Sequence, residues 1–408
     1  MAFAKLWVIA YRDLGRNRRR TLFTLIAVAL GVGLLILLEG YIAGVWDGAL
    51  QNAIRLQTGH VQVRNPEYEE QKVSLLWADL LENAGDTAAR AADLPEVKAA
   101  APVLWATAIL NTVNDSAGLK LYGIDPASAL YDPIREAMTA GEFLSAGDRS
   151  GILLGKRLAD ELGIGVGQNV SLTVVDADGQ ASEATFVVSG LYVSGVPSYD
   201  QNSAFMPLDK AQAFTGVGDR ASAVVMLLHR QEDADRVAAA LAGPNTTAET
   251  WQQMNQLLLE TVETTALLYN LLNLIVMLVV AVVIANTLLM AVFERIREMG
   301  ILAALGMKGR QIMLMYLLEA TILGLIGIAI GAALGSAGVG YLATKGIYIG
   351  DIASTVDSIA VGSTLYGRFV PGKFAWLSLW TLIVILLASL YPAWFAARLE
   401  PVDALRAQ

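Results

Sequence analysis

The sequence predicts an α-helical membrane protein with four transmembrane helices, one before and three after a large inserted domain of mixed α+β structure. Three observations support this fold class. Hydrophobic residues make up 55% of the 408 positions, and the mean hydropathy is +0.50. Charged residues make up only 16%, whereas an ordinary soluble domain carries about 25%. Four long intervals of the chain carry no charge at all.

The four uncharged intervals locate the predicted transmembrane helices. They contain 18, 30, 25 and 24 residues, at 21–38, 264–293, 320–344 and 374–397. A hydrocarbon core about 30 Å thick needs roughly 20 apolar residues in a helix. We therefore expect transmembrane helices at 21–46, 265–293, 312–343 and 374–397. The first could instead be a signal peptide, but its apolar core is longer than the usual ~7–15 residues and no clear cleavage site follows promptly.

The distribution of charge predicts the orientation. Segments 1–20, 294–311 and 395–408 together contain twelve basic and five acidic residues, whereas the loop 344–373 contains only three basic residues. Loops rich in Lys and Arg stay in the cytoplasm. We therefore expect an amphipathic cytoplasmic segment at 1–20, a cytoplasmic loop at 294–311 and a cytoplasmic tail at 398–408. The insert 47–264 and the loop 344–373 are then external.

The insert 47–264 carries the acidity of the chain, with 29 acidic and 14 basic residues. A solvated acidic surface explains this, and attraction of a basic partner is the alternative. Strand-like runs occur at 59–64, 97–110, 119–124 and 223–229, a helix-like run at 155–164, and a hairpin pattern with a DADGQ turn between 169 and 192. We expect a mixed α+β domain of one or two subdomains, whose last segment, 251–268, continues as helix straight into the second span.

The sequence excludes several chemistries. The absence of cysteine rules out disulfides and thiolate sites, and His60 and His229 lie far apart in the chain. The string GILLGKR at 151–157 has the wrong glycine spacing for a phosphate-binding loop, with Arg157 where Ser or Thr must bind magnesium. HExxH and GxSxG motifs are absent. We expect a non-catalytic chain that binds no metal or cofactor, and its net charge of −9 argues against a nucleic-acid partner.

The segment between the second and third predicted spans has an amphipathic pattern. Ile296, Met299, Ile301 and Leu302 alternate with charged residues, and the stretch ends at Gly306. This pattern predicts a short amphipathic helix at the cytoplasmic interface. A basic anchor that only fixes the topology is the alternative. Glu319 is expected near the start of the third span, where a carboxylate at a helix N-terminus has a structural role.

Glycines recur at four-residue spacing in the third span. Small residues at this spacing let two helix backbones approach closely. Gly327, Gly331 and Gly335 therefore predict a helix-packing seam.

Several strings, taken together, resemble permease subunits of the MacB/FtsX/Lol class of ABC transporters, the type VII or mechanotransmission class. The similarity covers essentially the whole chain in order, and the chain lacks the fused ATPase domain of the MacB pumps. The strings that carry it are ERIREMGILAALG (294–306), RQI (310–312), LLEA (317–320), YPAWFAARLEPVDALR (391–406), LYGIDP (121–126), GILLGKRLADELGIGVGQNVSL (151–172) and FVVSGLY (186–192), with the glycines of the third span.

The resemblance implies one span, a MacB-like periplasmic domain and an FtsX-like permease domain over 265–408, in the bacterial inner membrane. It also implies a permease dimer and a separate cytoplasmic ATPase pair, which binds ATP and magnesium and docks on the 294–306 helix. Residues on the expected coupling helix are Glu294, Arg295, Arg297, Glu298, Gly300, Leu305 and Gly306. Ala303 departs from the pattern, because many relatives carry a basic residue there.

Within this class, the length, the unfused permease and TGHVQV (58–63) are most similar to the lipoprotein-releasing Lol branch. There, a lipidated substrate lies between the outer halves of the first and second spans. The corresponding residues here are Leu38, Glu39, Tyr41, Ile42, Leu267, Leu268 and Leu271. Plain lipid contacts are the alternative for the apolar members, and for Glu39 the alternative is a side chain that reaches water.

Two alternative functions remain open at this point. One is an efflux permease that drives a periplasmic adaptor and an outer-membrane duct, and the other is a non-transporting regulator of a cell-wall hydrolase. The hairpin tip at 176–183 is too short for the hook with which one Lol permease recruits its periplasmic carrier. The sequence does not distinguish a homodimer from a heterodimer.

Overall fold

The computed structural model describes residues 7, 12, 15, 16, 18–68, 72–113, 115–147, 150–350, 353 and 360–398. Most of the predicted N-terminal segment 1–20 and nearly all of the predicted tail 398–408 lie outside these residues. The chain divides into two compact units. The helical unit comprises 1–46, 262–347 and 366–408, and the mixed unit comprises 47–261 and 348–365.

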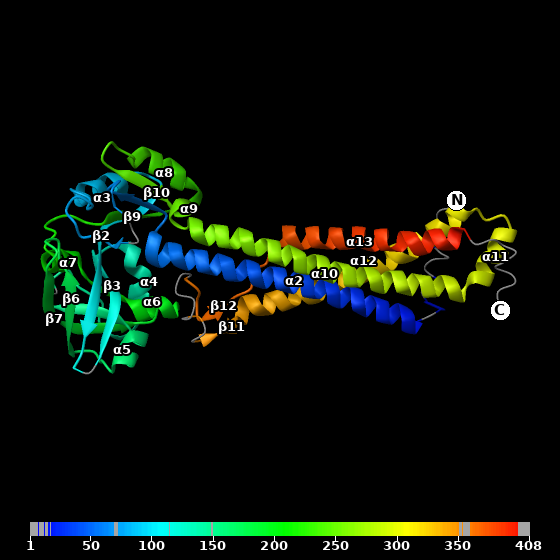
Figure 1. The fold of residues 1–408 in the computed structure, drawn as a ribbon, viewed down its shortest axis with the longest axis horizontal. Coiled ribbons are helices and arrows are strands. Elements are labelled where there is room, and N and C mark those ends of the chain that lie inside the picture. Colours follow the sequence, from blue (N-terminus) through cyan, green and yellow to red (C-terminus); the bar gives the residue numbers. More distant parts are fainter. Residues whose placement is uncertain are drawn as a thin grey trace. The chain divides into compact units, whose positions relative to one another are not determined.

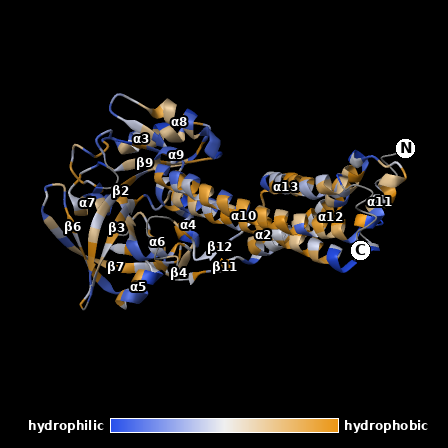
Figure 2. Ribbon diagram, turned by 45° about the vertical axis from the view of Figure 1, so that its right-hand side comes forward, coloured by the Kyte–Doolittle hydropathy of each residue, from blue (hydrophilic) through white to orange (hydrophobic). Residues whose placement is uncertain are grey.

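The described residues of the helical unit form four long apolar helices and one short one (Figure 1). The long helices are α2 (Arg18–Ala53), α10 (Gln256–Glu294), α12 (Gly309–Lys345) and α13 (Pro371–Ala397), and the short one is α11 (Ile296–Ala304). Each long helix is apolar enough and long enough to cross a membrane, and hydrophobic residues dominate all four (Figure 2). At 1.5 Å per residue, α2 is about 54 Å long, well above the ~30 Å of a hydrocarbon core.

The mixed unit contains a ten-stranded sheet, and nine of its strands follow the order β10-β1-β9-β2-β3-β8-β5-β7-β4. The tenth strand, β6, pairs with β2 and β7. The β3–β8 and β5–β7 pairs are parallel, and the others are antiparallel. The strands are β1 (Val61–Arg64), β2 (Val97–Asn111), β3 (Ser116–Ile124), β4 (Met138–Gly141), β5 (Gly151–Gly155), β6 (Asn169–Val175), β7 (Ala181–Tyr192), β8 (Ser203–Pro207), β9 (Ala223–Leu228) and β10 (Thr247–Thr250).

Two hydrophobic cores divide the mixed unit into subdomains that share β2. The first half of β2 pairs with β9, and its second half pairs with β3 and β6. The smaller core lies among β1, β9, α3 (Ala84–Ala92) and α8 (Ala234–Leu241). The larger core surrounds Trp105 and Phe205 and includes residues of α5 (Lys156–Leu162), α6 (Pro197–Asn202) and α7 (Leu208–Thr215). The mixed α+β prediction is confirmed, with two subdomains.

The predicted β6–β7 hairpin is confirmed, and its connection is short. β6 ends at Val175 and β7 begins at Ala181. Gly179 has a φ of 76°, and the backbone N–H of Asp176 donates to the carbonyl oxygen of Gln180 at 2.8 Å. A glycine tolerates this left-handed conformation because it has no Cβ.

The structure differs from the sequence-based expectation in the segment that leads into α10. One continuous helix was expected over 251–268, but α9 (Trp251–Met254) ends at Asn255 before α10 begins. The Asn255 side chain donates to the carbonyl oxygen of Trp251 at 2.8 Å. Asparagine side chains compete with the helix for backbone groups in this way, which explains the break.

Part of the loop between α12 and α13 belongs to the mixed unit. Tyr348–Leu365 folds with that unit. Two hydrogen bonds fix the segment: Asn52 Nδ2 donates to the carbonyl oxygen of Ala360 at 3.0 Å, and the N–H of Ser363 donates to the carbonyl oxygen of Gly195 at 2.9 Å. The strands β11 (Ile347–Tyr348) and β12 (Thr364–Leu365) pair into a short two-stranded sheet.

Candidate coupling site at the α11 end of the helical unit

α11 is a short helix set off by a break on each side. α10 ends at Glu294, and the backbone of Arg295 (φ −119°, ψ 15°) leaves the helical conformation before α11 begins at Ile296. At its other end, Gly306 has a φ of 93°, which favours glycine. α12 then starts at Gly309. The chain therefore makes two turns here and presents one isolated helix, as the amphipathic pattern predicted.

The two faces of α11 differ in exposure. Arg295, Met299 and Gly300 are buried in the helical unit. The opposite face exposes 47% of Ile301 and 80% of Leu305, together with Arg297. Two exposed apolar side chains four residues apart therefore share one face of this segment with an arginine. The coupling residues predicted from the sequence do not include Ile301, although it belongs to the same apolar pattern as Met299.

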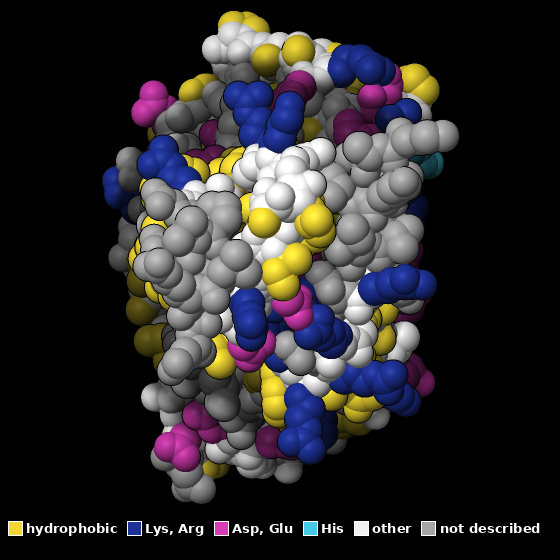
Figure 3. All heavy atoms as spheres, turned by 90° about the vertical axis from the view of Figure 1, so that its right-hand side faces the viewer, with side chains coloured by type: hydrophobic (Ala, Val, Ile, Leu, Met, Phe, Trp, Pro, Cys, Tyr) yellow, Lys and Arg dark blue, Asp and Glu magenta, His cyan; other side chains and the backbone are white. Residues whose placement is uncertain are grey.

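Two arginines, Arg20 of α2 and Arg16 just before this helix, reach the α10–α11 junction. Arg16 Nη2 lies 2.5 Å from Glu298 Oε1, and Arg20 Nη1 lies 2.9 Å from Glu294 Oε2. Arg20 therefore joins α2 to the end of α10, and Arg16 joins the segment before α2 to α11. Figure 3 shows this end of the molecule, where Lys and Arg side chains lie beside hydrophobic ones.

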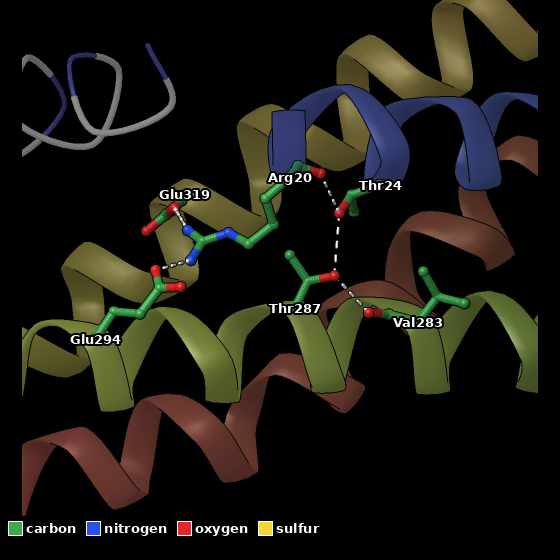
Figure 4. A network of polar contacts seen from close by, with 6 residues as sticks. All are labelled: Arg20, Thr24, Val283, Thr287, Glu294 and Glu319. Carbon is green, nitrogen blue, oxygen red and sulfur yellow. Dashed lines mark hydrogen bonds and ion pairs between the residues drawn. The ribbon is translucent and has the colours of Figure 1, made fainter. Parts of the chain in front are cut away.

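Arg20 also faces a buried carboxylate on α12. Its Nη2 lies 3.7 Å from Glu319 Oε1, and the Glu319 side chain is only 1% exposed (Figure 4). The expected role of Glu319 at a helix N-terminus is therefore wrong. α12 begins at Gly309, so Glu319 lies almost three turns into the helix, whereas the dipole effect falls off within the first turn.

Next to Arg20, two threonine hydroxyls form hydrogen bonds at the contact between α2 and α10 (Figure 4). Thr24 Oγ1 donates to the carbonyl oxygen of Arg20 at 3.0 Å and lies 3.0 Å from Thr287 Oγ1. Thr287 Oγ1 in turn donates to the carbonyl oxygen of Val283 at 2.7 Å. Each hydroxyl has one proton, so two protons serve the three short oxygen–oxygen contacts of Thr24 and Thr287.

The three glycines of α12 lie against α2. A Cβ added to Gly331 would be 2.6 Å from the carbonyl oxygen of Ala29, and one added to Gly335 would be 2.7 Å from that of Gly33. A Cβ added to Gly327 would be 2.6 Å from Val28 Cγ1. The backbones of α2 and α12 therefore approach closely along this seam.

The residues of the predicted substrate cavity lie toward the other end of the helical unit. Leu267, Leu268 and Leu271 of α10 are exposed, the first by 70%, while Leu38, Tyr41 and Ile42 of α2 are half-buried. Glu39 Oε1 lies 2.6 Å from Lys373 Nζ at the start of α13. The sequence did not predict this partner, because Lys373 is distant from Glu39 in the chain.

Lys156, Gly155 and His60 of the mixed unit each contact the fold around them. Lys156 Nζ, in the string that resembles a phosphate-binding loop, lies 2.9 Å from Asp160 Oδ1 in the same helix. A Cβ on Gly155 would be 1.8 Å from the carbonyl oxygen of Asp200, so close backbone approach requires this glycine. His60 Nδ1 accepts from the N–H of Leu228 at 2.9 Å, and burial lowers the pKa of His60.

Asp200 is the most strongly buried carboxylate of this region. Burial raises the pKa of Asp200 to about 6, although hydrogen bonds from Ser194 and Gly195 favour the charged form. Among the described residues, no group of three or more His, Asp or Glu side chains could hold a metal ion.

Comparison with known families covers both units. The profile of the MacB-like periplasmic core domain matches residues 21–243, and the profile of the FtsX-like permease C-terminal domain matches residues 270–401. The first match alone spans more than half of the chain.

Individual relatives agree with these profiles. The lipoprotein-releasing system transmembrane protein LolC of Xylella fastidiosa is 25% identical over 76% of this chain and 78% of its own length. LolE of Haemophilus influenzae, a transmembrane protein of the same kind of system, is 24% identical over 94% and 93%. The uncharacterized ABC transporter permease YknZ of Bacillus subtilis is 28% identical over 73% and 70%. The chain belongs to the MacB/FtsX/Lol-type family of ABC transporter permeases.

Proposed function

We propose that this chain transmits the ATP-driven motion of a separate cytoplasmic ATPase, through α11 and the long helices, to a periplasmic mixed unit. In this proposal α2, α10, α12 and α13 cross the bacterial inner membrane, both termini and α11 are cytoplasmic, and two permease copies form a dimer. The chain itself binds no ATP or magnesium. The observation that carries the proposal is the apolar exposed face of α11, held between two helices that are long enough to span the membrane.

The faces of α11 suggest how the predicted residues divide their roles. Arg297 and Leu305, joined by Ile301, form the docking surface for the ATPase. Glu294 and Glu298 hold α2 through their arginine partners. Arg295, Gly300 and Gly306 instead set the position and length of the helix, because the first two are buried and Gly306 has the positive φ.

The substrate we propose is a lipoprotein or another lipidated molecule extracted from the outer leaflet of the inner membrane. Two relatives, LolC and LolE, are named as parts of lipoprotein-releasing systems. The exposed leucines of α10 and the half-buried residues of α2 offer an apolar surface for an acyl chain. Glu39, already paired with Lys373, would be the nearest charged group for a substrate head group.

One observation favours the alternative of an efflux permease that works with a periplasmic adaptor. The β6–β7 connection is a tight turn, and nothing in it protrudes far enough to hook a carrier. A chain that hands its substrate to an adaptor would not need such a hook.

Purification of the full chain from its native membrane, followed by mass spectrometry, tests the proposal. We expect an ABC ATPase to copurify in every preparation, together with a lipoprotein. Recovery of an adaptor in place of a lipoprotein would support the efflux alternative, and recovery of a cell-wall hydrolase would support a regulator.

The docking surface has its own test. Ile301→Gln combined with Leu305→Gln should lower the ATPase recovered at least about tenfold, because docking would then bury two amides in place of two apolar side chains. Arg310→Gln, an exposed change at the start of α12, is the matched control and should leave recovery unchanged. Equal recovery from both variants would contradict docking on α11.

A further inference from the structure

The cluster around Arg20 raises the question of how a displacement of α11 reaches α2. α11 is joined through the backbone only to α10 and α12. α2 lies elsewhere in the chain and continues through the π-helical turn Ile54–Thr58 into β1 of the mixed unit. A movement that passes from α11 to α2 must therefore travel through the contacts that α2 makes with α10, α11 and α12, and near α11 the contacts of Arg16, Arg20 and Thr24 with these helices are made by side chains.

Arg20 makes the contacts that join α2 to both neighbours of α11. Its guanidinium bonds to Glu294 at the last residue of α10 and faces Glu319 on α12. A guanidinium presents several donors in a fixed plane, so it can address two carboxylates at once. A second ion pair, the exposed Arg16–Glu298, is formed by an arginine just before α2 in the chain.

The buried residues around Arg20 restrict the position of its side chain more than the surroundings of an exposed arginine would. Glu319 is almost completely buried, and Thr24, one turn further along α2, is also buried. Thr24 reaches Thr287 on α10. Beyond these residues the glycine seam between α2 and α12 begins at Val28, opposite Gly327. The contacts of Arg20, Thr24 and Val28 with α10 and α12 therefore follow one another along α2 at intervals of one turn.

We propose that Arg20 is a positioning residue that fastens α2 to the α10–α11–α12 segment, so that a displacement of α11 moves α2. The proposal rests on the proposed docking role of α11. The buried Glu319 distinguishes Arg20 from the exposed arginines nearby, because a buried carboxylate depends strongly on its charged partners. Loss of Arg20 should therefore loosen the α2–α10 contact at Thr24 and Thr287.

A disulfide reports this contact directly, because the chain has no cysteine of its own. Thr24 Oγ1 and Thr287 Oγ1 are 3.0 Å apart, so paired cysteines at these positions bring their sulfurs into range of a bond of about 2.05 Å with little movement. The T24C/T287C full chain is oxidised in native membranes, and the free thiols that remain are counted with a maleimide polymer on a gel.

Variants of Arg20 are then made in this background. R20M should slow formation of the disulfide at least about fivefold, because Glu319 loses its partner on α2. R20K should slow it less, since a lysine cannot bridge two carboxylates in a plane. R19M is the matched control: it removes the same charge from an exposed neighbouring position and should leave the rate unchanged. The double variant R20M/E319Q should recover part of the rate, because no buried charge is left behind.

The second measurement is ATP hydrolysis by the complex with its copurified ATPase. The R20M and R20K chains should retain the ATPase, yet should lose most of the dependence of hydrolysis on the permease, which R19M keeps. Unchanged disulfide rates in both Arg20 variants would overturn the inference, as would full coupling in both. A wild-type chain that retains no ATPase would instead contradict the proposed function, while the disulfide rates would still report on Arg20.

Discussion

The two ends of the helical unit hold α2 by different means. At the α11 end, Arg16 and Arg20 address three carboxylates, one of them buried. Toward the other end, an ion pair joins Glu39 to Lys373, and the backbones approach closely at Gly44, where an added Cβ would be 2.0 Å from the carbonyl oxygen of Tyr366. The α11 end therefore depends on charge, whereas the other end depends on shape.

The largest expected effect comes from the seam that connects these two ends. Gly331→Leu would overlap the backbone of Ala29 and the Cβ of Val32. We expect it to destabilise the helical unit by about 3 kcal/mol or more, because rigid backbone cannot yield. Gly340→Leu is the control on the same helix, since nothing lies within 4 Å of its position. Thermal unfolding of the purified chains compares the two, and equal melting temperatures would exclude a tight seam.

The next effect compares the carboxylates of the two ends. Removal of a partner from a largely buried ion pair is strongly destabilising, whereas an exposed pair contributes about 0–1 kcal/mol. Arg20→Met, which leaves Glu319 without that guanidinium, should therefore lower the melting temperature much more than Lys373→Met, which leaves Glu39. A larger loss from Lys373→Met would reverse the assignment of the charge-dependent end.

Substitutions on the outer face of α11 should separate stability from binding. Ile301→Gln changes a side chain that is 47% exposed, so the free energy of unfolding should change by less than about 1 kcal/mol. Met299→Gln, on the buried face of the same helix, should cost about 2 kcal/mol, because it places an amide in an apolar site. Thermal unfolding of the two variants tests this division of the faces. Similar losses would show that α11 has no free face.

The smallest effect is expected at the exposed Arg16–Glu298 pair. Its side chains are 62% and 41% exposed, so Glu298→Gln should change stability by less than about 1 kcal/mol. The change should shrink further in high salt, which screens exposed charges. A change that equals that of Arg20→Met would show that Arg20 has no special position.

Local patterns in the sequence were enough to predict much of this architecture. Uncharged intervals predicted four helices that could cross a membrane, alternation predicted the β6–β7 hairpin, and amphipathicity predicted α11. Each of these signals lies within one short stretch of chain. The ends of the helices were less well defined, because α2 and α10 continue as regular helix beyond their most apolar part.

Contacts between distant segments were not predictable in the same way. The meeting of Arg20 with Glu319, and of Glu39 with Lys373, depends on helix packing that no local pattern encodes. The same is true of the segment 348–365, which the sequence indicates only as a loop and which the fold places in the mixed unit. Glu319 still carried a signal, because a lone carboxylate in an apolar helix requires a partner.

The central claim is that the exposed face of α11 meets an ATPase in the cytoplasm, and a photo-crosslinker in place of Leu305 tests it most directly. Illumination of native membranes, followed by mass spectrometry, should recover an ABC ATPase bound to the full chain, in an amount that changes when ATP is supplied. A probe that captures no ATPase, or that is quenched by a membrane-impermeant reagent added outside intact cells, would contradict the account.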